Sequence, residues 1–224
     1  QLDVRAALQG TPVDDDGVFV RSLACRGEFG GLSAEVWPMS LVMLAAFDII
    51  LVETVGVGQR EIDVARMCDT TCFVAQPGSG DSIQFLKAGI LEVPHILVVN
   101  KEDMGAVAQR TLSELAGVLK RRHEDGGWEV PVLSASATRG TGIETIADTL
   151  EQHRAMLGAM GGLNNRRQRY QGHWLLKRLR DEFGSFGIRR LGGEQALLER
   201  VTEGLGSPFE QLESLRQRLL QELD

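Results

Sequence analysis

Short apolar runs alternate with amphipathic segments along the first two thirds of the chain. Runs rich in β-branched and apolar residues predict strands at Gly17–Leu23, Phe47–Val52, Thr70–Ala75, His95–Val99 and Val130–Ser134. Apolar residues at helical spacing predict helices at Ser33–Ala46 (interrupted near Pro38), Arg60–Arg66, Ser82–Leu91, Val107–Arg122 and Ile143–Met156. Strands that alternate with helices favour an α/β fold with a mostly parallel sheet flanked by helices on both faces.

The last third of the chain has a different pattern. Gly158–Asn165 is glycine-rich and is interpreted as a linker, so one α/β domain is predicted over residues 1–158 and a helical region over 159–224. Apolar residues recur at helical spacing at Tyr170, Trp174, Leu175, Leu179 and Phe183, and again at Leu212, Leu215, Leu219 and Leu223. Such stripes need a surface to bury against. They either pack onto their own chain or pair with a second copy, and the second option is slightly favoured.

Composition narrows the class of protein. Of the 224 residues, 43% are hydrophobic and 25% charged, which is ordinary for a globular protein. A net charge of −7 argues against nucleic acid as the main partner. No apolar run is long enough to cross a bilayer and no signal peptide is evident, so no membrane association is expected. Three cysteines do not make a disulfide framework, which favours a cytoplasmic location.

Two loops carry the pattern expected of a guanine site. Asn100, Lys101 and Asp103 form N-K-x-D directly after the apolar run HILVV. The carboxylate of Asp103 can accept two hydrogen bonds from the N1 and N2 edge of guanine, which adenine cannot offer. Lys101 can lay its stem over the base, and Asn100 can tie neighbouring loops together. The alternative for this motif is an ordinary turn at the end of a strand.

The second loop follows the next predicted strand. It reads S-A-x-x-G-x-G, from Ser136 and Ala137 through Thr138 to Gly142. The backbone N–H of Ala137 can meet the guanine carbonyl. Two such loops in this order, one strand and one helix apart, strengthen the prediction of a guanine nucleotide.

A third loop is suited to the phosphates. Glu53 ends an apolar strand, as in a Walker-B element, where a carboxylate holds Mg²⁺ directly or through water. Gly56 would let a backbone N–H approach a phosphate, and Gln59 could orient a water. An N-cap or salt bridge for Glu53 and a solvated position for Gln59 remain alternatives. Asp81 and Lys87, by themselves, suit a helix cap and a surface lysine.

These motifs together resemble the MeaB/ArgK/MMAA family of P-loop GTPases, which assist cobalamin-dependent methylmalonyl-CoA mutase and its relatives. The resemblance rests on Asp48–Gln59, Pro77–Glu92, Asn100–Asp103 and Ser136–Gly142. It implies a P-loop NTPase-like fold with a C-terminal helical dimerisation arm, GTP or GDP and Mg²⁺ as ligands, and a mutase as partner.

The resemblance also implies residue roles. Glu53 would belong to the Mg²⁺ site, and the segment from Gly56 to Gln59 would be a switch. Asp81 and Lys87 would be the polar residues of an additional switch loop that communicates the nucleotide state to the mutase. Arg26–Leu32 would lie near the first switch.

One feature of the family is missing from the sequence. The chain has four lysines, and none follows a glycine, so it contains no G-x-x-x-x-G-K-[ST] loop. The chain is then a truncated piece, or residues are absent from the sequence, or the lineage has lost the loop. In each case the sheet should lack its first strand, and weak nucleotide binding and little hydrolysis are expected from this polypeptide alone.

Three functions remain open. The first is a GTPase chaperone that loads and protects a cobalamin-dependent acyl-CoA mutase. The second is a degenerate G domain that works as a non-catalytic interaction module, and the missing G-x-x-x-x-G-K-[ST] loop is the observation that supports it. The third is an ATP-dependent kinase linked to basic amino-acid transport, which Asp103 argues against because it favours guanine.

Overall fold

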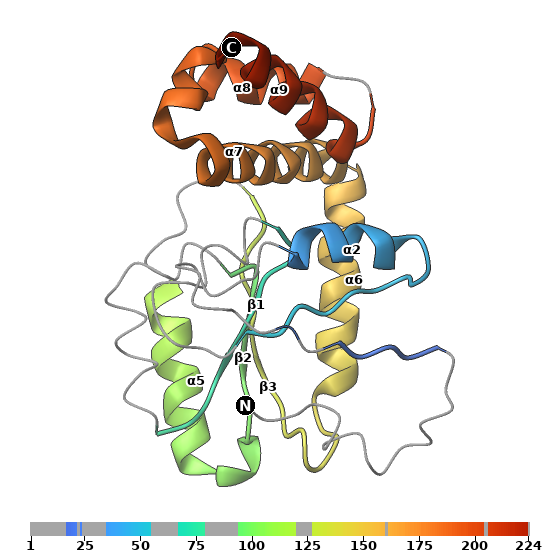
Figure 1. Cartoon of the computed structure of the whole chain (residues 1–224). Coiled ribbons are helices and arrows are strands. Elements are labelled where there is room, and N and C mark those ends of the chain that lie inside the picture. The colour runs from blue at the N-terminus through green and yellow to red at the C-terminus, as the bar shows by residue number, and fades with distance from the viewer. Residues whose placement is uncertain are drawn as a thin grey trace. The chain divides into compact units, whose positions relative to one another are not determined.

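The computed structural model describes residues 17–21, 23, 35–54, 67–78, 94–119, 127–159, 161–203 and 206–223. The chain forms two compact units, Gln1–Val64 and Ala65–Asp224. The second unit holds the sheet and the helices from α5 onward, and a ribbon drawing shows these elements (Figure 1). Predictions for Arg26–Leu32, Arg60–Arg66 and Ser82–Leu91 lie outside the described residues.

The first unit contains helix α2, Val36–Leu44. The helix predicted around Pro38 is confirmed, but the expected interruption is wrong. Glu35 is the N-cap residue, so Pro38 lies in the first helical turn. A first-turn N–H has no partner within the helix, so proline is tolerated there without a break.

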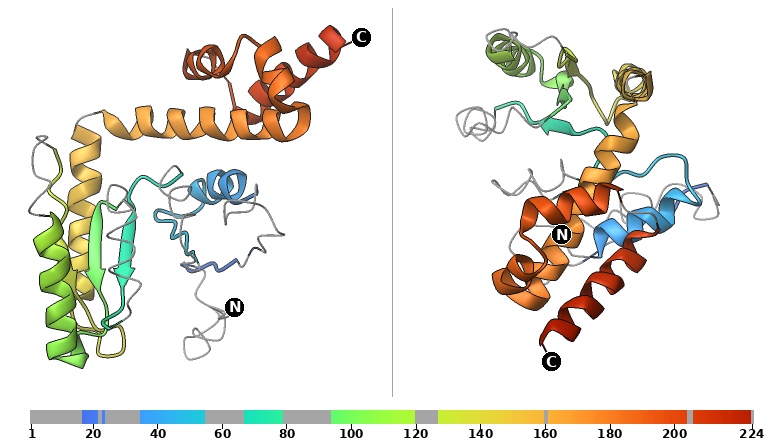
Figure 2. Two further views of the ribbon diagram at one scale, coloured as in Figure 1. Left: turned by 90° about the vertical axis from the view of Figure 1, so that its left-hand side faces the viewer. Right: turned by 90° about the horizontal axis from the view of Figure 1, so that it is seen from above.

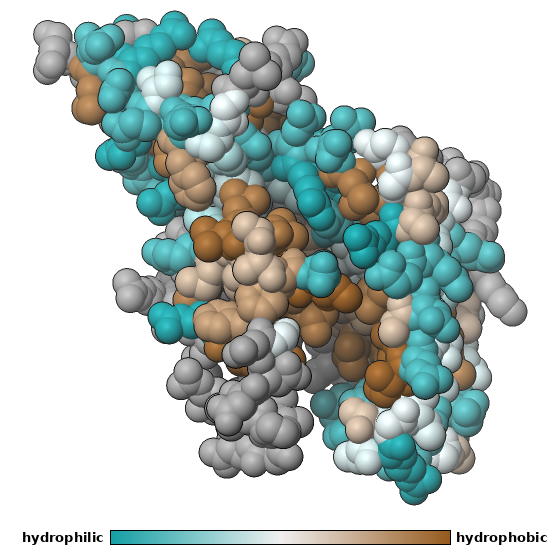
Figure 3. All heavy atoms as spheres, turned by 90° about the vertical axis from the view of Figure 1, so that its right-hand side faces the viewer, coloured by the Kyte–Doolittle hydropathy of each residue, from teal (hydrophilic) through white to brown (hydrophobic). Residues whose placement is uncertain are grey.

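The strands predicted at Gly17–Leu23 and Phe47–Val52 are not formed where the structure describes these segments. Ile49 and Leu51 are 66% and 85% exposed rather than buried. A β-branched run becomes a strand only when a neighbour supplies its hydrogen bonds, and no described strand pairs with Phe47–Val52. Hydrophobic residues are visible at the surface over part of the face drawn in Figure 3.

The second unit contains a parallel sheet of three strands among the described residues. Strands β1 (Cys72–Ala75), β2 (Ile96–Val99) and β3 (Val132–Ser134) pair in the order β1-β2-β3. The register aligns Ala75 with Val99 and Val99 with Ser134, so the strands end together. All four residues of the central strand β2 are buried. These three strands confirm the predictions made from the apolar runs.

Helices cover both faces of this sheet. Helix α5 (Ala106–Leu119) packs Ala108 and Leu115 against Ala75 and Val99. Helix α6 (Ile143–Ala159) covers the other face, where Ile96, Val98 and Ala135 pack with Ile146 and Leu150. Side chains alternate between the faces of β2, which explains the two separate clusters. Two further views show α5 and α6 on opposite sides of the strands (Figure 2). The predicted α/β fold is confirmed.

The linker predicted at Gly158–Asn165 is wrong. Helix α6 continues to Ala159, and α7 (Gly162–Arg190) begins almost at once. The break is Gly161, whose φ of 62° is left-handed and which glycine adopts without a Cβ penalty. The domain boundary between residues 158 and 159 stays a prediction.

The start of α7 is held against the segment that precedes β1. The Arg167 guanidinium makes a forked contact with the Asp69 carboxylate, at 2.5 Å between Nη2 and Oδ2. Tyr170 donates its hydroxyl to the Cys68 carbonyl at 2.9 Å. These residues lie about a hundred positions apart in sequence, so the helical arm is anchored to the segment that precedes β1.

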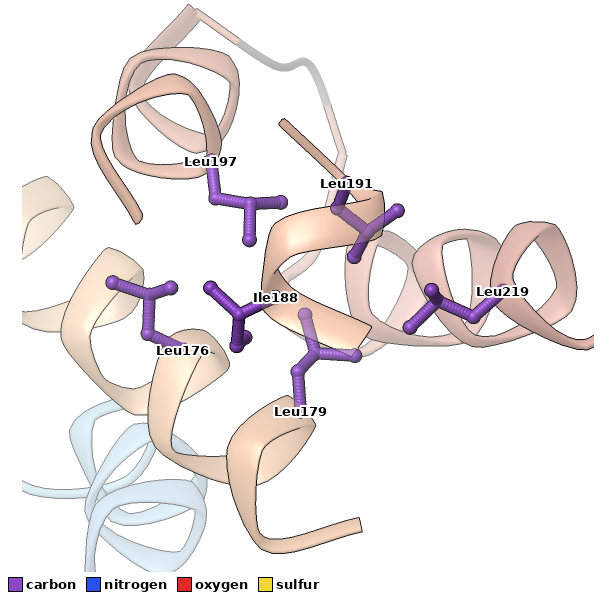
Figure 4. Packing of buried hydrophobic residues seen from close by; sticks show 6 residues of the cluster. All are labelled: Leu176, Leu179, Ile188, Leu191, Leu197 and Leu219. Atoms are coloured by element: carbon purple, nitrogen blue, oxygen red, sulfur yellow. The ribbon is translucent and has the colours of Figure 1, made fainter. Parts of the chain in front are cut away.

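The C-terminal apolar stripes bury largely within the chain. Helices α8 (Glu194–Glu203) and α9 (Pro208–Leu223) pack onto α7. Their shared core consists of Leu176, Leu179, Ile188, Leu191, Leu197 and Leu219, which point toward one another (Figure 4). Part of each stripe is therefore covered within the chain, and homodimerisation stays a prediction. No described helix is both long and apolar enough to span a membrane.

Candidate functional site

Two neighbouring strands bring the predicted base-binding residues to one edge of the sheet. Asn100 and Lys101 follow β2, and the short 3-10 helix η2 (Glu102–Met104) carries Asp103. Ser136, Ala137 and Thr138 follow β3. Because parallel neighbours end at the same edge, both loops lie side by side at the carboxyl ends of the strands.

Asn100 links the two loops. Its backbone N–H donates to the Ala75 carbonyl at 3.0 Å, which extends the ladder by one residue. Its side-chain oxygen Oδ1 accepts from the backbone N–H of Lys101 at 2.8 Å and of Ala137 at 3.1 Å. The Ala137 N–H, which the sequence assigns to a guanine carbonyl, is thus directed at Asn100 here. A bound base would have to share this donor.

Lys101 reaches from the end of β2 to the end of β1. Its φ of 58° is left-handed, the only such value for a non-glycine residue in the described part of the chain. A left-handed non-glycine residue is strained and marks a turn held by its surroundings. Lys101 Nζ donates to Gln76 Oε1 at 2.9 Å. Gln76, which the sequence pattern did not single out, therefore belongs to this edge.

Asp103 is held in its ionised form by its neighbours. Its carboxylate oxygen Oδ1 accepts a 2.6 Å hydrogen bond from the hydroxyl of Ser136. That bond, first, and a bond from its own backbone lower the pKa of Asp103, and the charges of Arg139 and Lys101 act in the same direction. Asp103 is exposed, so the carboxylate can accept from an incoming pair of N–H donors.

The loop after β3 is closed on itself. Ser136 is fully buried, and its N–H donates to the Thr141 carbonyl at 3.0 Å in an isolated bridge. The Ser136 hydroxyl also lies 3.2 Å from that of Thr138. Gly142 has a φ of +76°, and a Cβ there would lie 2.3 Å from the Ser134 carbonyl oxygen. Glycine is therefore required where the loop turns back into α6.

Glu102 also connects the loops after β2 and β3, although the sequence motifs did not single it out. Its carboxylate accepts the Ser134 hydroxyl at 2.9 Å and also the Thr141 hydroxyl. Its N–H donates to the Ala135 carbonyl at 2.9 Å. These hydroxyls, Thr141 first, lower the pKa of Glu102. Glu102 occupies the variable position of N-K-x-D, so no sequence signal marks it.

The candidate phosphate side is described in one residue only. Glu53 is exposed and lies in the first unit, after the unpaired segment Phe47–Val52. Gly56, Gln59, Asp81 and Lys87 lie outside the described residues. The described residues contain no group of three or more His, Cys, Asp or Glu side chains that could hold a metal ion. The two loops after β2 and β3 provide an edge suited to a base.

The arrangement favours recognition of a flat heterocycle by its polar edge. Asp103 offers a fixed carboxylate, and the loops around it are cross-linked by Asn100 and Glu102. Fixed acceptors discriminate between bases because a wrong base leaves them unpaired.

Comparisons with known proteins identify the family to which the chain is similar. The family model described as "Methylmalonyl Co-A mutase-associated GTPase MeaB" matches residues 4–186. A protein of Pyrococcus horikoshii is 40% identical over 159 residues, covering 69% of this chain and 50% of its own length. GTPase ArgK of Escherichia coli is 34% identical over 175 residues, covering 75% of this chain and 52% of its own length.

More distant similarities extend to animals and to a solved structure. The mitochondrial methylmalonic aciduria type A homolog of Caenorhabditis briggsae is 32% identical over 168 residues, covering 73% of this chain and 41% of its own. The crystal structure of an LAO/AO transport system kinase has a TM-score of 0.54 at 31% identity, over 81% of this chain and 60% of that one. The chain spans about half the length of the curated relatives it matches.

Proposed function

Because the chain belongs to the family of methylmalonyl-CoA mutase-associated GTPases, we propose that it binds guanine nucleotides through the loops that follow β2 and β3. The observation that carries the proposal is the cross-linking of these loops. Asn100 Oδ1 accepts the Ala137 N–H, and Asp103 Oδ1 accepts the Ser136 hydroxyl, at 3.1 Å and 2.6 Å. Two separate motifs are thereby joined into one edge.

The proposed chemistry at this edge is base recognition. Asp103 accepts the N1–H and N2–H donors of guanine, while Lys101 covers a face of the ring and Ala137 meets the carbonyl oxygen. Thr138 lies beside Ser136 and completes the loop. Adenine presents no such donor pair to Asp103 and leaves the carboxylate without partners.

The wider role follows the family. We assign to the intact protein GTP binding and hydrolysis that assist a cobalamin-dependent acyl-CoA mutase in cofactor loading and protection. Glu53 is assigned to Mg²⁺, Gly56 and Gln59 to the switch beside the phosphates, and Asp81 and Lys87 to the loop that signals to the mutase. Magnesium supplies charge neutralisation at the phosphates when it is bound. A homodimer in the cytoplasm is part of the same proposal.

The first experiment exchanges the base-reading carboxylate. Titrations of the full chain with GDP and with xanthosine diphosphate are compared for the wild type and Asp103→Asn. The variant's amide can donate to the carbonyl that xanthine carries at C2, so its preference should move from guanine toward xanthine by about tenfold or more. Glu114→Ala, on the exposed face of α5, serves as the matched surface control. An unchanged preference in Asp103→Asn would contradict the assignment.

The second experiment concerns the partner. Co-purification of a cobalamin-dependent mutase with the intact gene product is measured with GTP, with GDP and without nucleotide. Capture that differs between the nucleotides supports the chaperone role. Absence of capture in all three states would count heavily against the chaperone role.

A further inference from the structure

The variable residue of the N-K-x-D motif makes more contacts across the site than its position suggests. The Glu102 carboxylate accepts hydroxyl hydrogen bonds from Ser134, the last residue of β3, and from Thr141, on the far side of the loop. Its backbone N–H is bound to the Ala135 carbonyl at 2.9 Å. Glu102 therefore contacts the loop after β3 at both ends of that loop.

These contacts continue to the residue that reads the base. The Thr141 carbonyl accepts the Ser136 N–H at 3.0 Å, and the Ser136 hydroxyl donates to Asp103 at 2.6 Å. Each step of the path from Glu102 through Thr141 and Ser136 to Asp103 is a hydrogen bond between residues of the described loops. The path ends on the adjacent residue in sequence, so the whole path is a closed ring.

We propose that Glu102 is a positioning residue for guanine specificity, which holds the Ser136–Thr141 loop closed so that Ser136 orients the Asp103 carboxylate. This inference rests on the proposed guanine-nucleotide function. A carboxylate suits the role because it accepts two hydroxyl hydrogen bonds at once and donates none. An alanine at this position offers no acceptor and leaves both hydroxyls to solvent.

Hydrogen bonds from neighbouring hydroxyls stabilise the two adjacent carboxylates, Glu102 and Asp103. The adjacent charge of Asp103 disfavours the ionisation of Glu102, yet the hydrogen bonds from Thr141 and Ser134 dominate and lower the pKa of Glu102, and the hydrogen bond from Ser136 lowers that of Asp103. Both carboxylates are therefore acceptors at neutral pH. Neutralising Glu102 alone keeps the shape of the side chain and removes one negative charge.

The test is a double-mutant cycle on the full chain, with GDP and inosine diphosphate as probes. Inosine diphosphate lacks the 2-amino group that Asp103 reads. Glu102→Ala should weaken GDP binding by about tenfold, the size expected for loss of a charge-assisted hydrogen bond, and should weaken inosine diphosphate binding less. In an Asp103→Ala background, the same change should cost less than about twofold, because the effect passes through Asp103. Glu102→Gln, whose amide still accepts one hydroxyl, should recover most of the affinity.

The outcomes separate the two proposals. Loss of GDP affinity that disappears in the Asp103→Ala background supports the positioning role. Equal losses in both backgrounds, or equal losses for the two nucleotides, show general loop damage and overturn it. Wild-type affinity in Glu102→Ala also overturns it and leaves the nucleotide function standing. A wild-type chain that prefers neither guanine nor inosine over adenine overturns the proposed function and this inference together. Glu102→Gln serves as the folded reference if Glu102→Ala does not fold.

Discussion

The turn at Gly142, which leads from the Ser136–Thr141 loop into α6, provides a test of the geometry of that loop. Gly142 has a φ of +76°, and an added Cβ would lie 2.3 Å from the Ser134 carbonyl oxygen and 3.0 Å from the Ala135 Cα. Both are backbone atoms, so no side-chain rotation relieves the contact. Gly140, in the same loop, has a φ of +71° but nothing within 4 Å of an added Cβ. Substitution of each glycine by alanine therefore compares left-handed strain with and without a backbone clash.

The two costs can be worked out from the structure. Left-handed strain for an L-residue costs roughly 1–2 kcal/mol and applies to both positions. At Gly142 the added Cβ and the Ser134 carbonyl oxygen must also move apart by up to about 1 Å. This shift breaks the 3.0 Å hydrogen bond between the Ser136 N–H and the Thr141 carbonyl. A lost backbone hydrogen bond adds about 1 kcal/mol. Gly142→Ala should therefore cost about 2–3 kcal/mol, and Gly140→Ala about 1–2 kcal/mol.

Urea unfolding followed by circular dichroism measures both variants. The free energy of unfolding should fall further for Gly142→Ala by at least about 1 kcal/mol, at an unchanged denaturant slope. If the clash is relieved by local movement instead, the difference should appear as faster exchange of the Ser136 amide proton in Gly142→Ala alone. Two variants that match in both stability and exchange would refute the geometry of this turn.

Two further predictions concern the second unit. Leu179 is 1% exposed in the core shared by α7, α8 and α9, and Leu179→Ala should lower the free energy of unfolding by about 2–5 kcal/mol. Leu220 is 51% exposed, and Leu220→Ala should lower it by less than about 0.5 kcal/mol in the same urea assay. Equal losses would contradict the packing. Burial, first, together with the charges of His153 and Arg166, lowers the pKa of His95 from 6.5 to about 4, so the unfolded chain takes up the proton first. Stability should then fall as pH drops from about 6.5 toward about 4, by about 2 kcal/mol once partial exposure is allowed for. His95→Gln should flatten this slope between pH 7 and 4.5, and an equal slope would exclude His95 as its source.

The local apolar pattern was sufficient to predict the three described strands of the sheet. The runs at Thr70–Ala75, His95–Val99 and Val130–Ser134 contain β1, β2 and β3, and the helical spacing after the last two predicted α5 and α6. In these segments the apolar periodicity and the burial agree, because the neighbouring strand and the covering helix lie close along the chain. The polar residues after β2 and β3 were placed correctly at one edge for the same reason.

Where pattern failed, the missing information was a partner. Phe47–Val52 has the composition of a buried strand, but no described strand pairs with it and Leu51 is 85% exposed. The glycines around Gly158–Asn165 suggested a linker, yet most of that segment is helical because Leu157 is buried and α7 is fixed to Asp69 by Arg167. Composition alone does not reveal such distant contacts.

The sequence by itself determined which residues are candidates for binding a base: N-K-x-D and S-A-x-x-G-x-G name them and their order, because each motif is a short run that is recognised by residue type and spacing. The tertiary structure alone decided how those residues are held. Glu102 and Gln76 have no motif, and they enter the site only because β1, β2 and β3 end at one edge of the sheet. A hydrogen bond between residues 25 to 39 positions apart depends on how the whole sheet pairs, and no local pattern encodes that.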